Sequence, residues 1–424
     1  MATESQGSAG KVVVGPPMRV AILADFAQAS GGAQSVAIQS ALALAGQGVE
    51  VTYLHGIDGP ADPRLAAAGV DVVGLGQPDI WDRSLAAGLG AGIWNRDAAR
   101  RLDAALRQLP AGPTVLHLHQ WTRSLSPSVY PVLFRSGHPV VVTLHDYFIA
   151  CPNGVYYRFE RDAPCSLTPL SPACIAARCD PRSMAHKAVR VLRTAATRRA
   201  LRGGPFDVVH VSDRGRDTVA PFLPPNARQH RIDNPVEVTR AAPAEIGRDA
   251  KLAYIGRLTR EKGADLVAEA AGRAGMPVLF IGEGPAEAAI RQANPAAELL
   301  GWRSRSEIDQ LLRCDVRAVV APSRWYETGP LTVYEALAAG IPAVVSGRAG
   351  AAEKVLSGET GFVVEPEVDA LASALGRLAD IALVRRMGQA AHERYWQAPL
   401  SAERHAAALM ALYESLHRGR AGAA

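Results

Sequence analysis

The chain has 424 residues, of which 48% are hydrophobic and 21% charged, a composition typical of a globular protein and long enough for two domains. The formal net charge is only +5, and the cations form no stripe with interleaved aromatic residues, so we do not expect nucleic-acid binding. No run of 18 apolar residues could span a membrane, and residues 1–10 lack the apolar centre of a signal peptide. We therefore expect a cytoplasmic protein.

The first half of the chain predicts a parallel sheet. Residues 1–17 are typical of a flexible tail, and residues 18–25 form an apolar strand. Gly31 and Gly32 then open a helix that continues to about Ala45. After it, strands at 49–54, 70–75, 115–119, 140–145 and 208–212 alternate with helical stretches such as 96–109 and 126–135. Short β-branched strands that alternate with helices indicate a parallel sheet covered on both faces.

The same pattern restarts after a linker at about 238–249. It predicts a helix at 264–274, one or two final helices at 390–416, and strands at 251–255, 277–281, 316–321 and 341–346. Two doubly wound halves predict an α/β protein with two Rossmann-like domains that face a cleft.

The segment after the strand 316–321 predicts a ligand site at a helix N-terminus. Pro330 suits the first turn of a helix, and Gly340 followed by Pro342 is a natural stop, so we expect a helix at 330–339. Its N-terminus lies at the carboxyl edge of the sheet, where phosphates bind to free N–H groups and to the positive end of the helix dipole.

Two acidic residues flank this helix N-terminus at different distances. Glu327 lies in the preceding loop and can reach a group beyond the phosphates, whereas Glu335 lies inside the helix and faces a group beside it. A carboxylate accepts two hydroxyl hydrogen bonds at once, which suits the vicinal hydroxyls of a sugar. The alternative for Glu335 is a capping box with Thr332, three residues earlier.

Two loops earlier in this half also follow buried strands. In residues 255–263, Arg257 and Lys262 can converge on a diphosphate, although a solvated surface turn is the alternative. In residues 281–285, Gly284 lets the backbone approach a ligand, and such a loop is weak evidence by itself.

Together and in this order, the motifs resemble the retaining glycosyltransferases of family four. The resemblance covers nearly the whole chain. It rests on Gly256-Arg-Leu-x-x-x-Lys-Gly263, Gly282-x-Gly284, Pro322-Ser323 with Glu327 and Glu335, and the N-terminal pieces Gly31-Gly32-Ala33, Leu144-His145-Asp146 and Asn234-Pro235-Val236.

The resemblance implies the GT-B fold. Residues 18–237 would form the acceptor-side domain and residues 250–389 the nucleotide-sugar domain, with the helices at 390–416 packing back on the acceptor side. It also implies that Arg257 and Lys262 neutralise the donor diphosphate.

The resemblance further implies a role for each acid and for two residues of the first domain. Glu335 would hold the ribose hydroxyls, Glu327 would contact the transferred sugar, and Gly32 would lie near the diphosphate. His145 would lie at the reaction centre and help to align the acceptor. The alternative for His145 is a core histidine that ends a strand.

The sequence departs from the family pattern between the two acids, where an aromatic residue and a glycine are common and Gly329 and Pro330 stand here. Pro330 has no N–H, so phosphate contacts would come from Gly329, Leu331 or Thr332. Trp302 and Arg303, beside a strand-to-helix turn, are candidates to flank the base.

The implied activity is transfer of a hexose from a UDP- or GDP-sugar to a glycan or a lipid-linked acceptor, with retention of configuration, in polysaccharide or glycolipid synthesis. No metal cofactor is needed if Arg257, Lys262 and the helix N-terminus stabilise the leaving diphosphate. Two alternatives remain: a nucleotide-sugar epimerase of the same fold, and a catalytically silent protein that binds nucleotide sugars.

Residues 183–204 carry six cations and no acid. Met184, Ala188, Val191, Leu192 and Ala195 follow a loose helical period, so the segment predicts either a peripheral membrane contact or an ordinary solvated helix. The cations are Lys187, Arg190, Arg193, Arg198, Arg199 and Arg202.

Four of the five cysteines are clustered, at Cys151, Cys165, Cys174 and Cys179. Four thiolates can bind structural zinc in tetrahedral geometry, although the paired Cys-x2-Cys spacing of zinc ribbons is missing. A reducing cytoplasm disfavours disulfides. Structural zinc, disulfides and free buried thiols are the three alternatives, and we expect the cluster to shape the acceptor side rather than to perform chemistry.

Overall fold

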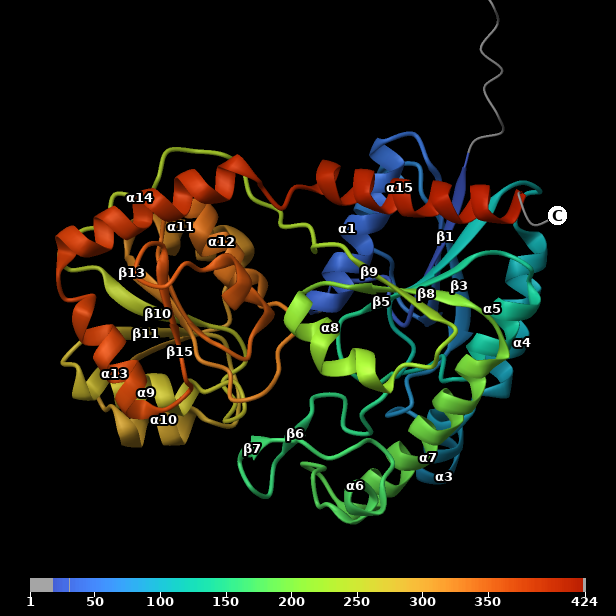
Figure 1. Cartoon of the computed structure of the whole chain (residues 1–424), viewed down its shortest axis with the longest axis horizontal. Coiled ribbons are helices and arrows are strands. Elements are labelled where there is room, and N and C mark those ends of the chain that lie inside the picture. Colours follow the sequence, from blue (N-terminus) through green and yellow to red (C-terminus); the bar gives the residue numbers. More distant parts are fainter. Residues whose placement is uncertain (1–17, 30, 422–424) are drawn as a thin grey trace, which may run out of the picture.

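The computed structural model describes residues 18–29 and 31–421, so the predicted tail at 1–17 lies outside the described residues. Two parallel sheets, each covered by helices, form two α/β domains that lie side by side (Figure 1). This arrangement confirms the predicted fold class.

The first domain contains a seven-stranded parallel sheet in the order β3-β2-β1-β4-β5-β8-β9. Every residue of its central strands β4 and β5 is buried, as expected when helices cover both faces. The strands are β1 (Arg19–Ala24), β2 (Glu50–Ile57), β3 (Asp71–Gln77), β4 (Thr114–Leu118), β5 (Val140–Leu144), β8 (Phe206–His210) and β9 (Ala227–Arg231).

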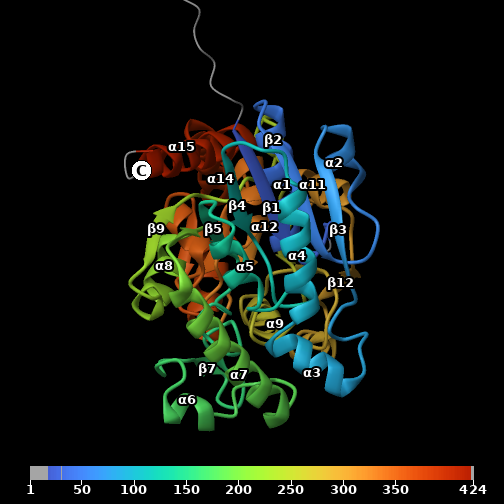
Figure 2. The same ribbon diagram turned by 90° about the vertical axis from the view of Figure 1, so that its right-hand side faces the viewer.

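Helices on both sides of this sheet connect its strands (Figure 2). They are α1 (Gly32–Gly46), α2 (Pro63–Ala67), α3 (Leu85–Ile93), α4 (Arg96–Gln108), α5 (Val129–Arg135), α7 (Met184–Ala200), η1 (Leu201–Gly203), α8 (Asp213–Val219) and η2 (Ala220–Phe222). Between β5 and α7 the chain forms an excursion with little regular structure, which contains the antiparallel pair β6 (Tyr157–Arg158) and β7 (Ala163–Pro164) and the short α6 (Pro172–Ala176).

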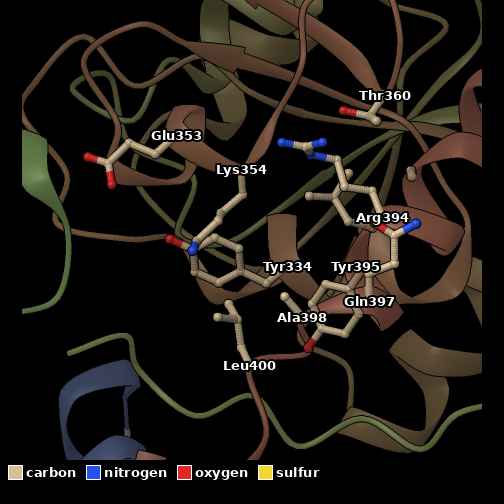
Figure 3. Close-up of a pocket in the computed structure, with 11 residues that line it drawn as sticks. Tyr334, Glu353, Lys354, Thr360, Arg394, Tyr395, Gln397, Ala398 and Leu400 are labelled. Atoms are coloured by element: carbon tan, nitrogen blue, oxygen red, sulfur yellow. The ribbon is translucent and has the colours of Figure 1, made fainter. Parts of the chain in front are cut away.

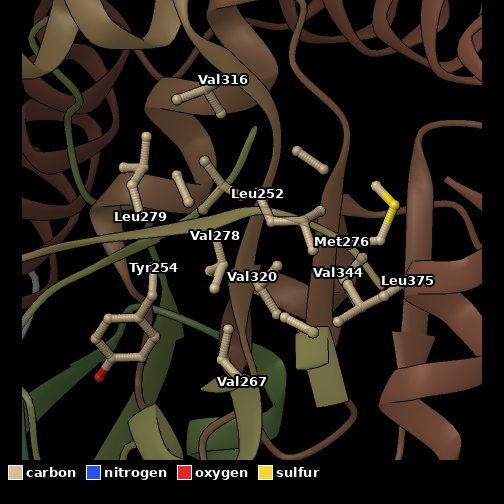
Figure 4. Close-up of a cluster of buried hydrophobic side chains, with 14 of the residues drawn as sticks. Leu252, Tyr254, Val267, Met276, Val278, Leu279, Val316, Val320, Val344 and Leu375 are labelled. Carbon is tan, nitrogen blue, oxygen red and sulfur yellow. The ribbon is translucent and has the colours of Figure 1, made fainter. Parts of the chain in front are cut away.

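The second domain contains a six-stranded parallel sheet in the order β12-β11-β10-β13-β14-β15. Leu252, Val278, Val320 and Val344 from four neighbouring strands meet in its core (Figure 4). The strands are β10 (Lys251–Ile255), β11 (Val278–Ile281), β12 (Glu298–Gly301), β13 (Val316–Ala321), β14 (Ala343–Ser346) and β15 (Gly361–Val364). The helices are α9 (Ala264–Arg273), α10 (Glu287–Ala293), α11 (Arg305–Cys314), α12 (Leu331–Ala339), η3 (Gly350–Lys354) and α13 (Val368–Arg377).

The chain crosses back to the first domain later than the expected residue 390. α14 (Ile381–Gln397) stays on the second domain, where Trp396 donates from Nε1 to the carbonyl of Ala338 at 2.9 Å. Of the two last helices, only α15 (Ala402–Ala421) lies on the first domain (Figure 1). Its Tyr413 hydroxyl hydrogen bonds to Nδ1 of His117 at 2.6 Å. The crossing comes after residue 390 because the buried face of α14, which packs on the second domain, continues through His392 and Tyr395.

Candidate functional site

A cavity of about 830 Å³ lies between the two domains. From the first domain it is lined by Ala29, Gly32, Ser35, Gln39 and Arg64, and from the linker by Glu237, Val238 and Thr239. The second domain contributes residues of β10, α11, β13 and α12, among them Lys262, Glu327, Leu331, Thr332 and Glu335. Six of the sequence-predicted site residues therefore meet in one cavity.

Two helix N-termini, one from each domain, point to this cavity. Gly31 is the N-cap of α1, and Pro330 is the N-cap of α12 rather than a residue of its first turn. Among the described residues, no side chain caps either helix. Because the first N–H groups of a helix have no intrahelical partner and carry partial positive charge, the cavity suits an anionic ligand such as a phosphate.

Lys262 and Glu327 form an ion pair beside the N-terminus of α12. Nζ of Lys262 lies 2.7 Å from Oε1 of Glu327, and the Ser323 hydroxyl donates to Oε2 of the same carboxylate. Burial by itself would raise the pKa of Glu327, but Lys262 and Ser323 outweigh it and lower the pKa below its usual value. Glu327 is therefore held ionised in the cavity wall.

Glu335 faces the same cavity from the second turn of α12. Its Oε1 accepts from Nη2 of Arg305 at 3.3 Å, and Arg305 also contacts Glu237 in the linker. Burial raises the pKa of Glu335, with Arg305 opposing the shift. Because Pro330 is the N-cap, the alternative of a capping box between Thr332 and Glu335 is wrong.

Arg257 and Gly284 lie outside the cavity. The Arg257 side chain is exposed and makes no ion pair within the described part of the chain, while its carbonyl accepts from the Tyr254 hydroxyl at 2.8 Å. Gly284 has a φ of +159°, and a Cβ there would lie 2.3 Å from the Leu258 carbonyl oxygen. This glycine lets two backbone segments approach each other closely.

The residues expected to flank the base also lie elsewhere. The Trp302 side chain is 70% exposed, and Arg303 contacts the Trp302 carbonyl and Glu307 outside the cavity. The next helix, α11, lines the cavity in their place with Arg305, Ile308 and Asp309.

His145 ends β5 beside a second histidine that sequence reasoning missed. Nε2 of His145 shares a hydrogen bond of 3.0 Å with Nδ1 of His119, at the end of β4, and the two rings stack. Burial lowers the pKa of His145 to about 3, so its ring is neutral near pH 7. The spacing His117-Leu-His119 at a strand end was the available signal.

Several contacts tie this strand edge to the second domain. The Thr328 hydroxyl, next to Glu327, donates to the carbonyl of His145 at 3.0 Å. Arg260, in the loop that contains Lys262, pairs at 2.7 Å with Asp162 at the tip of the β6–β7 pair. His145 is thus placed beside the Glu327 loop although it does not line the cavity.

The clustered cysteines meet around a small cavity of about 10 Å³, lined by Cys151, Cys165, Cys174 and Cys179 together with Lys187. All five cysteines of the chain are free thiols. Within residues 18–29 and 31–421, no group of three or more His, Cys, Asp or Glu side chains is arranged to hold a metal ion. In the structure the four cysteines of the cluster are therefore free thiols.

Helix α7 is turned differently from the expected membrane-facing helix. Lys187 and Arg193 are only 1% and 7% exposed, and Arg190 pairs with buried Asp180 at 3.0 Å. Met184 and Leu192 are instead 45% and 56% exposed. Three of the six cations therefore face inward, because Cys179, Asp180 and Phe148 provide partners there. Only Arg198, Arg199 and Arg202 remain exposed.

A second cavity, of about 330 Å³, lies on the other side of α12, between Tyr334 and the side chains of Arg394 and Tyr395 on α14 (Figure 3). Lys354 in its wall pairs with Asp233 at 3.1 Å, next to the linker. None of the sequence-predicted site residues lines this cavity within the described chain.

Two protein-family models match parts of the chain. The model described as Glycosyl transferases group 1 matches residues 236–394, and the model described as Glycosyltransferase Family 4 matches residues 30–176. Each half of the chain thus matches one model, in the order that the two domains have in the structure.

Curated proteins match part of the chain. The glycogen synthase of Mycobacterium tuberculosis is 36% identical over 159 residues, which are 34% of this chain and 38% of that protein. An exopolysaccharide phosphotransferase of Streptomyces coelicolor is 34% identical over 151 residues, which are 32% of this chain and 16% of that protein. The matches therefore span less than half the length of either relative.

Solved structures match nearly the whole chain. Sucrose-phosphate synthase from Thermosynechococcus elongatus has a TM-score of 0.68 and 18% identity, and the match covers 95% of this chain and all of that one. The Anabaena protein HepE, in complex with UDP and glucose, has a TM-score of 0.64 and 16% identity, with coverage of 94% and 100%. These likenesses show a shared fold. Among the described helices, none has the length and apolar character needed to cross a bilayer.

Proposed function

Because the chain has the two domains of a GT-B glycosyltransferase, we propose that it transfers a hexose from a nucleoside-diphosphate sugar to an acceptor hydroxyl with retention of configuration. One observation carries the proposal: Lys262, Glu327, Glu335 and the N-termini of α1 and α12 line one interdomain cavity. Cations and helix N-termini suit a diphosphate, and carboxylates suit ribose and hexose hydroxyls.

The proposed roles follow from where each group lies. Lys262 and the first N–H groups of α12 stabilise the charge that develops on the leaving diphosphate, and exposed Arg257 reaches it when the donor is bound. Glu335 accepts from the ribose hydroxyls, and Glu327 accepts from the hexose. Neutral His145 orients the acceptor hydroxyl, and the leaving phosphate takes its proton as the new bond forms on the same face.

The proposal extends to the substrates. A UDP- or GDP-hexose is the proposed donor, and a growing glycan or a lipid-linked sugar is the proposed acceptor, in polysaccharide or glycolipid synthesis. The support is the structure of the neighbour HepE in complex with UDP and glucose, and the matches to a glycogen synthase and an exopolysaccharide phosphotransferase. No metal cofactor is part of the proposal, because the cations and helix N-termini supply the positive charge.

The test measures release of nucleoside diphosphate from a panel of UDP- and GDP-sugars, with and without glycan acceptors. We expect release that depends on acceptor and on one donor, together with a product in which the anomeric configuration is kept. A change of the sugar without an acceptor would identify an epimerase, and donor binding without any turnover would identify a silent binding protein. Either result would overturn the proposal.

We also propose a cytoplasmic location with peripheral contact at the inner face of the membrane. Leu192 and Met184 on α7 and Ile175 on α6 are exposed, and Arg198, Arg199 and Arg202 at the C-terminal end of α7 and in η1 are exposed as well. We expect the protein to sediment with anionic vesicles at low salt and to lose this binding in a Leu192→Asp variant. Equal sedimentation with neutral and anionic vesicles would contradict the proposal.

A further inference from the structure

A groove of about 290 Å³ lies at the C-terminal end of α7, away from the interdomain cavity. One wall is the end of α7 and η1, and another is η2 with the proline-containing segment that follows it. The third wall is a short piece of the cysteine-containing excursion, Thr168-Pro169-Leu170. The groove thus lies where three separate parts of the first domain meet.

The groove combines an apolar surface with two cations. Ile149, Leu201, Phe222 and Leu223 provide much of the apolar lining, and prolines provide more of it. Arg198 and Arg202 are four residues apart on one helical face, so they are neighbours at the groove. In the described chain neither arginine has an ion-pair partner, and the residues that line the groove include no acid.

The third wall of the groove is held in a strained conformation. Leu170 has a φ of +63°, in the left-handed region that a residue with a bulky side chain rarely adopts. Nearby, the backbone N–H of Ser171 donates to the Thr168 carbonyl at 3.1 Å, which closes this turn. Pro169, inside the turn, also lines the cavity of the four thiols, so the buried cysteine cluster supports this wall.

We propose that this groove binds a phosphorylated lipid, with its hydrocarbon chain along the apolar walls and its phosphate between Arg198 and Arg202. An apolar wall selects for a chain, and two unpaired guanidinium groups select for a phosphate, so an amphiphile that carries both satisfies the groove better than either part alone.

The inference rests on the proposed function in one respect, because it assigns the lipid as the carrier of the acceptor sugar. The groove is connected to the reaction centre by a short segment: Ile149 and Ala150 in its wall follow His145 by four and five residues. One wall of the groove therefore belongs to the same chain segment as the histidine proposed to align the acceptor.

The test uses dodecyl phosphate below its micellar concentration, with dodecyl maltoside and inorganic phosphate as the two partial ligands. Calorimetry is performed on the full chain without a nucleotide sugar. We expect dodecyl phosphate to bind at least about tenfold more tightly than either partial ligand, as charge-assisted hydrogen bonds predict. Equal binding of dodecyl phosphate and dodecyl maltoside would overturn the assignment.

Variants decide whether the two arginines are responsible. The double variant Arg198→Gln, Arg202→Gln should bind dodecyl phosphate about tenfold or more weakly than the wild type. Arg199→Gln is the matched control, since Arg199 is also exposed and is next to Arg198 on α7 but lies outside the groove, and it should change binding less than about twofold. An equal loss in the control would show general attraction of anions and would overturn the proposal.

The binding assay is independent of sugar transfer. If dodecyl phosphate binds as expected and no donor is turned over, the proposed function fails while the lipid site stands. If transfer to a soluble glycan occurs and dodecyl phosphate does not bind, the lipid site fails alone.

Discussion

The ammonium group of Lys262 lies 2.7 Å from Oε1 of Glu327. The cation proposed for the donor's diphosphate and the acid proposed for its hexose are therefore partners of each other in the structure. With the proposed roles, a bound donor separates the pair, and Lys262 and Glu327 each exchange a contact with the other for a contact with the donor.

Removal of Lys262 should change the pH dependence of activity. Lys262 lowers the pKa of Glu327 against the opposing effect of burial, so in Lys262→Met only the hydrogen bonds from Ser323 and Trp325 still oppose burial and the pKa of Glu327 rises. Because the proposed contact with the hexose needs ionised Glu327, the acid limb of the kcat/KM profile should move to higher pH, besides an overall loss of activity.

The same pair contributes to stability. Since the folded pKa of Glu327 is depressed, its contribution is present above the unfolded pKa and is lost as pH falls through the folded pKa. Lys262→Met should therefore reduce stability at pH 7 more than at acid pH. If the acid limb of the kcat/KM profile of Lys262→Met lies at the same pH as in the wild type, Lys262 is not what lowers the pKa of Glu327.

Glu335→Gln should weaken binding of the donor by about 1.5–3 kcal/mol, because the carboxylate would lose charge-assisted hydrogen bonds to ribose. The measurement is the dissociation constant of the bare nucleoside diphosphate. Glu245→Gln, an exposed acid outside the cavity, is the control and should bind like the wild type. Unchanged affinity in Glu335→Gln would show that the ribose lies elsewhere.

Tyr413→Phe should destabilise the protein by about 1–3 kcal/mol, because it leaves Nδ1 of His117 buried without its 2.6 Å hydrogen bond. Tyr130→Phe is a matched control in the same domain, since the Tyr130 hydroxyl is buried and has no hydrogen-bond partner among the residues described. Urea unfolding midpoints compare the two. Equal losses in both variants would contradict the stated cause.

The thiols should react in two classes. Exposed Cys314 should react rapidly with a thiol reagent in the native protein, whereas buried Cys151, Cys174 and Cys179 should react only on unfolding, when all five thiols become available. Release of about one equivalent of zinc on unfolding would instead restore the metal site that the side-chain arrangement does not support.

The sequence predicted the two sheets because their strands are apolar and β-branched, as in β5 with Val-Val-Val-Thr-Leu. It missed β9, Ala-Arg-Gln-His-Arg, which is half-exposed at the edge of its sheet and therefore has no apolar signature. The N-terminus of α12 was predicted because proline and glycine mark helix ends locally. Features that depend only on neighbouring residues in the sequence, such as these strands and helix ends, could thus be predicted from the sequence.

Features that depend on distant partners were not accessible. Arg305 reaches Glu335 and Glu237 across 30 and 68 residues of sequence, and nothing near Arg305 indicates those partners. The orientation of α7 was missed for the same reason. Lys187 turns inward toward Cys179 and Arg193 toward Phe148, so the usual rule that cations face water fails there.

The return of the last helix to the first domain has a consequence during synthesis. Leu409, Leu412 and Tyr413 of α15 belong to the same core as Val20 and Ile22 of β1, so β1 can complete its packing only after α15 has been synthesised. A ribosome therefore releases the second domain before the first can be completed, and one apolar face of the first sheet stays open until then. We expect chaperones that bind nascent chains to engage this face, and ribosomes stalled before residue 402 to carry an unfinished first domain.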